Sequence, residues 1–133
     1  MTRINTGLHP LEIPPKLLMA EHREMVRIPA LARRRNGDFT DCPETFRLGS
    51  GHVKFFYPRI LYLWRRYVVV HETLKRVHNY NVTNCSQSFL DLPRHAYGDY
   101  TPSPEDRQIL LDRFAERGHT LLPLEQPCKT DRL

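Results

Sequence analysis

The sequence predicts an all-α fold: one compact domain spanning residues 1–133, with three helices joined by long loops. Three observations support this prediction. A chain of 133 residues is sized for a single domain. Apolar residues recur at three- and four-residue spacing in three separate segments, which is typical of amphipathic helices. No segment shows the apolar and polar alternation of a strand, and no internal repeat is present.

The N-terminal part of the chain predicts an arm followed by a long helix. Residues 1–13 contain glycine and proline without helical period, so we expect an irregular arm. A periodic segment covers residues 14–35 and begins with two prolines, which the first helical turn tolerates. Asn36-Gly37 then ends the helix. Pro29 lies inside the pattern and predicts a kink or a break within residues 25–28.

This first helix carries two carboxylates on its apolar face. Leu18, Met25 and Ile28 share one arc at about 100° per residue, and Glu21 and Glu24 fall inside it. The flank next to Glu24 carries a column of arginines, namely Arg23, Arg27 and Arg34. A carboxylate facing a core is costly unless it is paired. We therefore expect either a structural ion pair or a working acid.

Two further helices are predicted. Pro58 opens a helix over residues 58–79. Its inward positions are Ile60, Leu63, Trp64, Tyr67, Val70, His71, Leu74 and Val77. Its other side is basic, which suits either a solvated face or one that meets phosphates. The last helix starts at Ser103, with proline at its first position and an acid three residues after the cap, and it runs to Gly118.

Charge and cysteine content narrow the function classes. The net charge is +5, and the excess of Lys and Arg is concentrated in residues 1–36 and 58–80, a distribution suited to a polyanion. Cys42, Cys85 and Cys128 are far apart, so we expect reduced thiols and no disulfide framework or metal site. No long apolar run or signal core is visible, so we expect a cytoplasmic protein without a membrane partner.

Several motifs together resemble the phage endonuclease V family, the pyrimidine-dimer DNA glycosylases with AP lyase activity. The matching pieces are MTRIN at 1–5, LMAEHRE at 18–24, Arg27, GSGHVKFFY at 49–57, LKR at 74–76 and GDYTP at 98–102. They follow the family's order over about 120 residues. The resemblance implies a helical bundle with the N-terminal arm inserted between helices, of phage or bacterial origin, acting as a monomer on damaged double-stranded DNA.

The resemblance also implies a mechanism. Met1 would be removed, and the α-amine of Thr2 would attack C1′ of the damaged nucleotide, forming an imine before β-elimination nicks the strand. Glu24 matches the family's catalytic acid, and no metal or organic cofactor is needed. An α-amine titrates near 8 and a lysine near 10.4, so far more of the α-amine is neutral at pH 7. Glu21 is expected to support Glu24 or to pair with an arginine.

The same resemblance assigns DNA binding to Arg3, Arg23 and Arg27. A guanidinium fork suits phosphate oxygens. The alternative for Arg23 and Arg27 is a solvated pair, and for Glu24 it is a buried partner of one of these arginines. His52 is expected to form hydrogen bonds that shape a loop rather than to catalyse.

The chain departs from the family pattern at three places. Leu17 stands where members often carry a histidine, and His22 replaces an aromatic residue. No aromatic residue follows Phe114, whereas the family's dimer glycosylases end in a Tyr and Trp cluster close to the lesion. The resemblance therefore does not identify the damaged base that the protein would recognise. The alternatives are a lyase for abasic sites, a glycosylase for another modified base, and a DNA-binding module without catalysis.

Overall fold

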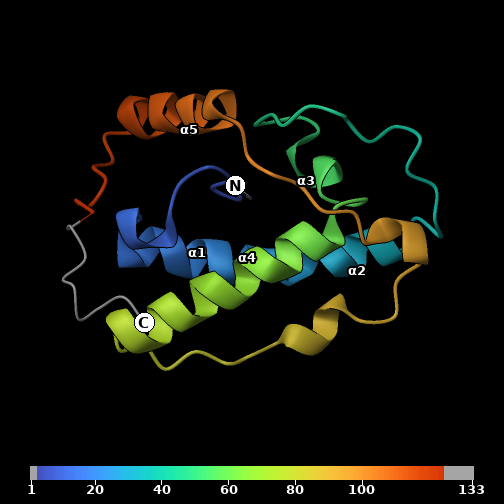
Figure 1. Cartoon of the computed structure of the whole chain (residues 1–133), viewed down its shortest axis with the longest axis horizontal. Coiled ribbons are helices and arrows are strands. Elements are labelled where there is room, and N and C mark those ends of the chain that lie inside the picture. The colour runs from blue at the N-terminus through green and yellow to red at the C-terminus, as the bar shows by residue number, and fades with distance from the viewer. Residues whose placement is uncertain (1–2, 125–133) are drawn as a thin grey trace.

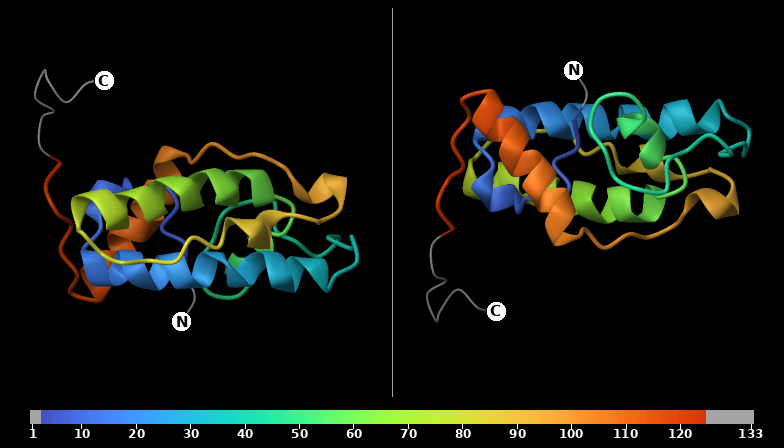
Figure 2. Two further views of the ribbon diagram at one scale, coloured as in Figure 1. Left: turned by 90° about the horizontal axis from the view of Figure 1, so that it is seen from below. Right: turned by 90° about the horizontal axis from the view of Figure 1, so that it is seen from above.

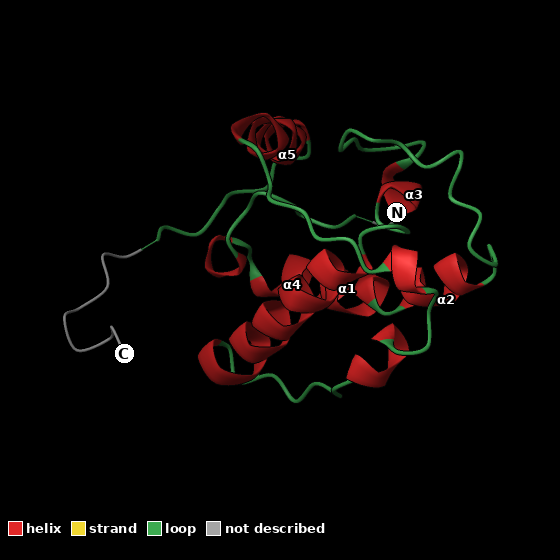
Figure 3. Cartoon of the chain, turned by 45° about the vertical axis from the view of Figure 1, so that its right-hand side comes forward, coloured by secondary structure: helices red, strands yellow, loops and turns green. Residues whose placement is uncertain are grey.

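The computed structural model describes residues 3–124, and within this range the protein is all-α, as predicted. Its α-helices are α1 (Pro15–Met25), α2 (Arg27–Arg33), α3 (His52–Phe55), α4 (Ile60–Glu72) and α5 (Pro104–Glu116) (Figure 1). Helices and loops make up all of the described chain (Figure 3), apart from an isolated bridge between Arg59 and Tyr97. No helix between residues 3 and 124 is long and apolar enough to cross a membrane.

The predicted long N-terminal helix is divided into two helices. α1 ends at Met25, and Val26 joins it to α2. Pro29 is the third residue of α2, so its missing N–H falls in the first turn, where no intrahelical partner is available. The predicted break is therefore confirmed. Asn36 and Gly37 both adopt positive φ and end the segment, as expected.

The second predicted helix changes its geometry near its end. After α4, the chain continues as a π-helical turn, η2 (Thr73–Val77), in which the His78 N–H donates to the Thr73 carbonyl at 3.2 Å. A π-turn holds more residues per turn than an α-helix, so it shifts the phase of the side chains. Val77 is consequently 54% exposed, and its predicted inward position is wrong.

The start of α5 agrees with the sequence prediction. The Ser103 hydroxyl accepts a hydrogen bond from the Asp106 N–H at 3.1 Å, and the Asp106 carboxylate accepts one from the Ser103 N–H at 3.0 Å. Pro104 is the first helical residue. This reciprocal cap satisfies two N–H groups at the helix start.

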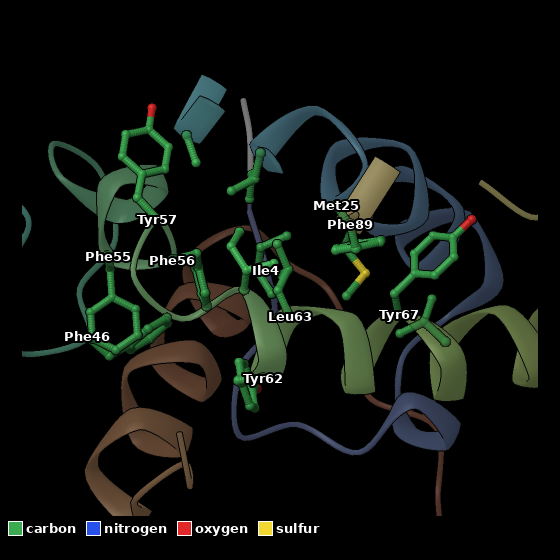
Figure 4. Close-up of a cluster of buried hydrophobic side chains, with 14 of the residues drawn as sticks. Ile4, Met25, Phe46, Phe55, Phe56, Tyr57, Tyr62, Leu63, Tyr67 and Phe89 are labelled. Atoms are coloured by element: carbon green, nitrogen blue, oxygen red, sulfur yellow. The ribbon is translucent and has the colours of Figure 1, made fainter. Parts of the chain in front are cut away.

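The N-terminal arm, defined here as residues 3–13, belongs to the hydrophobic core. Ile4, Leu8 and Ile13 are buried together with side chains of α1, α3 and α4. Figure 4 shows Ile4 within the cluster that contains Phe56 and Leu63. α1 and α4 pack against each other (Figure 2). An irregular segment buried in this way must have its backbone polar groups paired, and their partners define the site below.

Candidate functional site

A small pocket lies where the arm begins. It has a volume of about 180 Å³ and brings together the arm, α1 and the residues around the C-terminal end of α5. Its lining residues are Arg3, Asn5, Leu17, Ala20, Glu21, Glu24, Phe114, Arg117 and His119. Three of the residues singled out in the sequence, Arg3, Glu21 and Glu24, therefore meet in one place.

Glu24 is the carboxylate of this pocket that keeps contact with solvent. Its side chain is 17% exposed, and Arg27, three residues further on, is 64% exposed. One nitrogen of the Arg27 guanidinium donates to both oxygens of Glu24, at 2.8 and 2.7 Å. A carboxylate held by a solvent-exposed arginine remains accessible for proton transfer. Glu24 thus pairs with one of the arginines, as the alternative for it expects, but the pair reaches solvent instead of being buried. This pairing is compatible with a role as an acid.

Glu21 is held differently, although it lines the same pocket. It is buried, and the guanidinium of Arg66 on α4 donates to both of its oxygens, at 2.5 and 3.3 Å. The Asn5 side-chain amide donates to Glu21 Oε1 at 2.8 Å. Burial by itself would lower the pKa of Arg66, but the charge and hydrogen bonds of Glu21 raise it. Glu21 is thus the core-facing member of an ion pair, and it ties the arm to α1 and α4.

Two other arginine contacts fix the backbone of the arm. Arg66 also donates to the Leu8 carbonyl at 3.0 Å. Arg107, on α5, donates to the Gly7 carbonyl at 3.2 Å and forms an ion pair with Glu12 at 2.6 Å. These bonds satisfy carbonyl groups that no helix or strand can pair. The arm therefore has a defined path up to the pocket.

His52, the first residue of α3, contacts the arm at Ile4, the second residue of the arm. The Ile4 N–H donates to His52 Nε2 at 2.8 Å, and His52 Nδ1 contacts the Arg47 carbonyl at 2.7 Å. His52 does not line the pocket. Its predicted part as a hydrogen-bonding residue is confirmed, and its partner is the arm as well as its own loop.

Arg3 lies in a strongly basic environment. Burial, together with the positive charges of Arg113 and Arg117, lowers the pKa of its guanidinium. Arg113 and Arg117 were not singled out in the sequence, although their four-residue spacing near the end of a predicted helix places them on one face. Arg113 also forms an ion pair with Glu116 at 3.4 Å. These arginines thus lie beside a pocket that also contains the carboxylates of Glu21 and Glu24.

Arg23 on α1 and Arg27 at the start of α2 lie at a second hollow. Both are exposed, and they line a pocket of about 490 Å³ together with residues of the loop at positions 81–85. Arg27 bonds to Glu24, so it connects the two hollows. The arginines predicted for DNA binding thus divide into one at the small pocket, Arg3, and two beside it.

Some predicted residues cannot be placed. Thr2, the expected nucleophile, and Met1 lie outside the described residues, as does Cys128. Thr2 is joined to Arg3 by a single peptide bond. Cys42 and Cys85 are free thiols. Among residues 3–124, no group of three or more His, Cys, Asp or Glu side chains is arranged to hold a metal ion.

No model of a known protein family matches the sequence. The residues of the site combine a solvent-accessible carboxylate, a surrounding group of arginines and the beginning of the arm. Arginine forks can bind phosphate oxygens, and an accessible carboxylate can transfer protons.

Proposed function

We propose that the protein is a DNA repair glycosylase with AP lyase activity, in which the Thr2 α-amine is the nucleophile and Glu24 the catalytic carboxylate. One observation carries the proposal. Arg3, which directly follows Thr2 in the sequence, lines the same 180 Å³ pocket as Glu24, although 21 positions separate the two residues. The peptide bond between Thr2 and Arg3 limits how far the amine can lie from this pocket.

The reaction would proceed in two steps. The neutral amine attacks C1′ of the damaged nucleotide, and the bonding electrons of the N-glycosidic bond leave with the base, which takes up a proton. The amine nitrogen then gives up one proton, its lone pair forms the C=N bond as the C1′–O4′ bond breaks, and O4′ takes up a proton, so a protonated imine to the opened sugar remains. Abstraction of a proton from C2′ then expels the 3′ phosphate by β-elimination. Glu24 would transfer these protons and stabilise the cationic intermediates.

The basic residues around the site would hold the strand. Arg3, Arg23 and Arg27 would bind phosphates, each by a guanidinium fork. An enzyme that acts on a base within a duplex must displace a nucleotide from the stack. The 490 Å³ hollow beside Arg23 and Arg27 offers space for such a nucleotide.

The proposal extends to the architecture and setting of the protein. It treats α1, α4 and α5 as the three principal helices of a bundle, with the arm inserted between them. Hydrogen bonds of the arm to Glu21 on α1, Arg66 on α4 and Arg107 on α5 support this description. The protein would act as a monomer on duplex DNA in the cytoplasm of a bacterial or phage-infected cell.

Borohydride trapping on two duplexes tests the proposal. One duplex carries a thymine dimer, and the other carries an abasic site. We expect both to give a covalent complex with protein whose N-terminus is Thr2, and protein that retains Met1 to give none. Trapping on the abasic duplex alone would identify a lyase, since a lyase cuts only pre-formed abasic sites. The absence of any complex with a verified Thr2 terminus would reject the amine chemistry.

A further inference from the structure

The hydrogen bonds of His52 define its protonation state. A backbone N–H can only donate, so His52 Nε2, which receives the Ile4 N–H at 2.8 Å, must carry no proton. A carbonyl oxygen can only accept, so His52 Nδ1, at 2.7 Å from the Arg47 oxygen, must carry one. The two backbone partners therefore select the neutral imidazole with its proton on Nδ1.

The surroundings of His52 favour this neutral form. Its side chain is buried, and the rings of Phe46 and Phe56 meet it edge to face, with centroids at 5.6 and 5.4 Å. Burial lowers the pKa of His52 below its ordinary value, against the opposing effect of the Arg47 carbonyl. The charged groups that act on it from neighbouring elements are Arg3 and Arg113, which also lower the pKa, and Glu21, which raises it.

The hydrogen bond between Ile4 and His52 lies close in the chain to the proposed nucleophile. Ile4 lies two residues after Thr2, so its N–H fixes the backbone close to the proposed nucleophile. The other side chains that hold the arm are the ion-paired Glu21, Arg66 and Arg107. Histidine is the residue whose ordinary pKa lies in the range just below neutral pH. The contact nearest to Thr2 in this set can thus be switched by a proton.

We propose that His52 is a positioning residue: as a neutral imidazole it holds Ile4, and so sets the Thr2 amine against the pocket that contains Glu24, and its protonation releases the start of the arm. This inference rests on the proposed function. A proton on Nε2 would turn the acceptor into a donor facing the Ile4 N–H, which leaves both groups without a partner. The amine would then lose its alignment with the substrate.

Two substitutions separate the hydrogen bond from the bulk of the ring. In His52→Gln, the side-chain carbonyl can reach the position of Nε2 and accept from Ile4, and it does not titrate. His52→Phe keeps a ring and removes the acceptor. His95→Phe is the matched control, because His95 is exposed and bonds to the Gly37 carbonyl at 2.8 Å, away from the arm.

The readout is single-turnover trapping by borohydride on an abasic-site duplex, measured together with duplex affinity. For His52→Phe we expect a maximal trapping rate reduced by about tenfold or more with nearly unchanged affinity, because small misplacements of reacting groups are costly. His52→Gln should retain most of the rate. As pH falls through the lowered pKa of His52, which lies below the ordinary value of about 6.5, the rate of the wild type should fall relative to that of His52→Gln, since the two proteins share the titration of the amine.

Each outcome has a distinct meaning. Equal maximal rates for the wild type and His52→Phe, or a wild-type to His52→Gln ratio that stays constant with pH, would overturn the inference and leave the proposed function intact. No trapped complex with the wild type would overturn both. If circular dichroism shows that His52→Phe is unfolded, the pH dependence of the rate ratio between the wild type and His52→Gln tests the inference.

The tautomer of His52 gives an independent test. Nitrogen-15 spectra of the wild type should show a protonated Nδ1 and an unprotonated Nε2, and the opposite tautomer would also overturn the inference.

Discussion

Two glutamates three residues apart on α1 occupy different environments. Glu21 is enclosed by Arg66 and Asn5, whereas Glu24 reaches solvent beside Arg27. A carboxylate locked in a buried ion pair cannot readily exchange protons, and an accessible one can. This difference favours Glu24 over Glu21 as the proposed catalytic carboxylate, and Glu21 holds the arm.

At the residue scale, Glu24→Gln is the substitution that tests the chemistry. It keeps the shape of the side chain and removes its ability to transfer protons, so strand cleavage on an abasic duplex should slow by about 10²–10⁴-fold. Gel analysis of nicking under single-turnover conditions measures the effect. Glu44→Gln is the control, because Glu44 is exposed and lies outside the small pocket. Unchanged nicking by Glu24→Gln would remove Glu24 from the mechanism.

Neighbouring arginines on α4 provide a second test at this scale. Arg66→Met leaves the charge of Glu21 buried without its partner, so the free energy of unfolding should fall by about 3–5 kcal/mol. Arg65 pairs with Asp99 at 2.5 Å on the surface, where both side chains are more than half exposed, so Arg65→Met should cost at most about 1 kcal/mol. Urea unfolding measures both. Similar losses for the two variants would show that the buried pair of Arg66 and Glu21 contributes no more to stability than a surface pair.

At the scale of elements, α1 and α4 meet through two histidines. His22 Nε2 and His71 Nδ1 lie 3.1 Å apart, and the rings stack with centroids at 5.3 Å. A hydrogen bond between the two nitrogens requires that one of them carry a proton and the other none. Burial, followed by the charges of His71 and Arg23, lowers the pKa of His22, while Glu21 opposes this effect.

This histidine contact predicts a pH dependence of stability. The unfolded chain takes up a proton on His22 near its ordinary pKa of about 6.5, and the folded protein resists that proton until lower pH. The contribution of neutral His22 to the free energy of unfolding is therefore fully present above pH of about 6.5. It is lost as pH falls through the folded pKa of His22. Urea unfolding between pH 5 and 8 should show this loss, and His22→Phe should make the slope shallower, leaving the part that comes from buried His52. His95→Gln should leave the slope unchanged, and a slope in His22→Phe equal to that of the wild type would refute the assignment.

At the scale of elements, the sequence predicts those helix boundaries that are determined by neighbouring residues. The break before Pro29 and the cap at Ser103 follow from single residues and their immediate neighbours. The prediction failed at η2, because a π-turn has no clear sequence signal, and Val77 was assigned to the wrong side. The one-turn helix α3 was also missed, since a four-residue helix is too short to show a period.

At the scale of the whole molecule, the two basic segments have different roles. In the segment 58–80, Arg66 is buried against Glu21, and Arg65 and Arg76 pair with acids of this chain. Its positive charge is therefore largely compensated locally. The region around the arm, α1 and the end of α5 also contains ion pairs, namely Arg27 with Glu24 and Arg113 with Glu116. It is the candidate for a surface that binds a polyanion because of its position at the small pocket.

Binding measurements test this division of the charge. Arg23→Ala should weaken duplex binding to a similar extent for all sequences and lower the salt dependence by about one counterion. Arg76→Ala, which removes a residue paired with Glu72 at 2.5 Å, serves as the control and should change little. Fluorescence anisotropy at several salt concentrations measures both. Equal effects of the two variants would indicate a diffuse basic surface rather than this one.

The residues of the site could be predicted from the sequence only where they lie on one helix. The two carboxylates of α1 were visible from helical spacing, and their expected need for partners was correct. The partner of Glu21 could not be named, because Arg66 lies 45 positions away and only the packing of α1 on α4 brings it close. Arg113, Arg117 and His119 were missed for the same reason, since no local pattern links the end of α5 to the arm.

The most direct test of the central claim is to map the covalent bond in the borohydride-trapped complex. Protein with a Thr2 terminus is trapped on an abasic duplex, digested after glutamate, and analysed by mass spectrometry. The account predicts the sugar adduct on the α-amine of the peptide that covers residues 2–12, which contains no lysine. An adduct on Lys16, Lys54, Lys75 or Lys129 instead would contradict it.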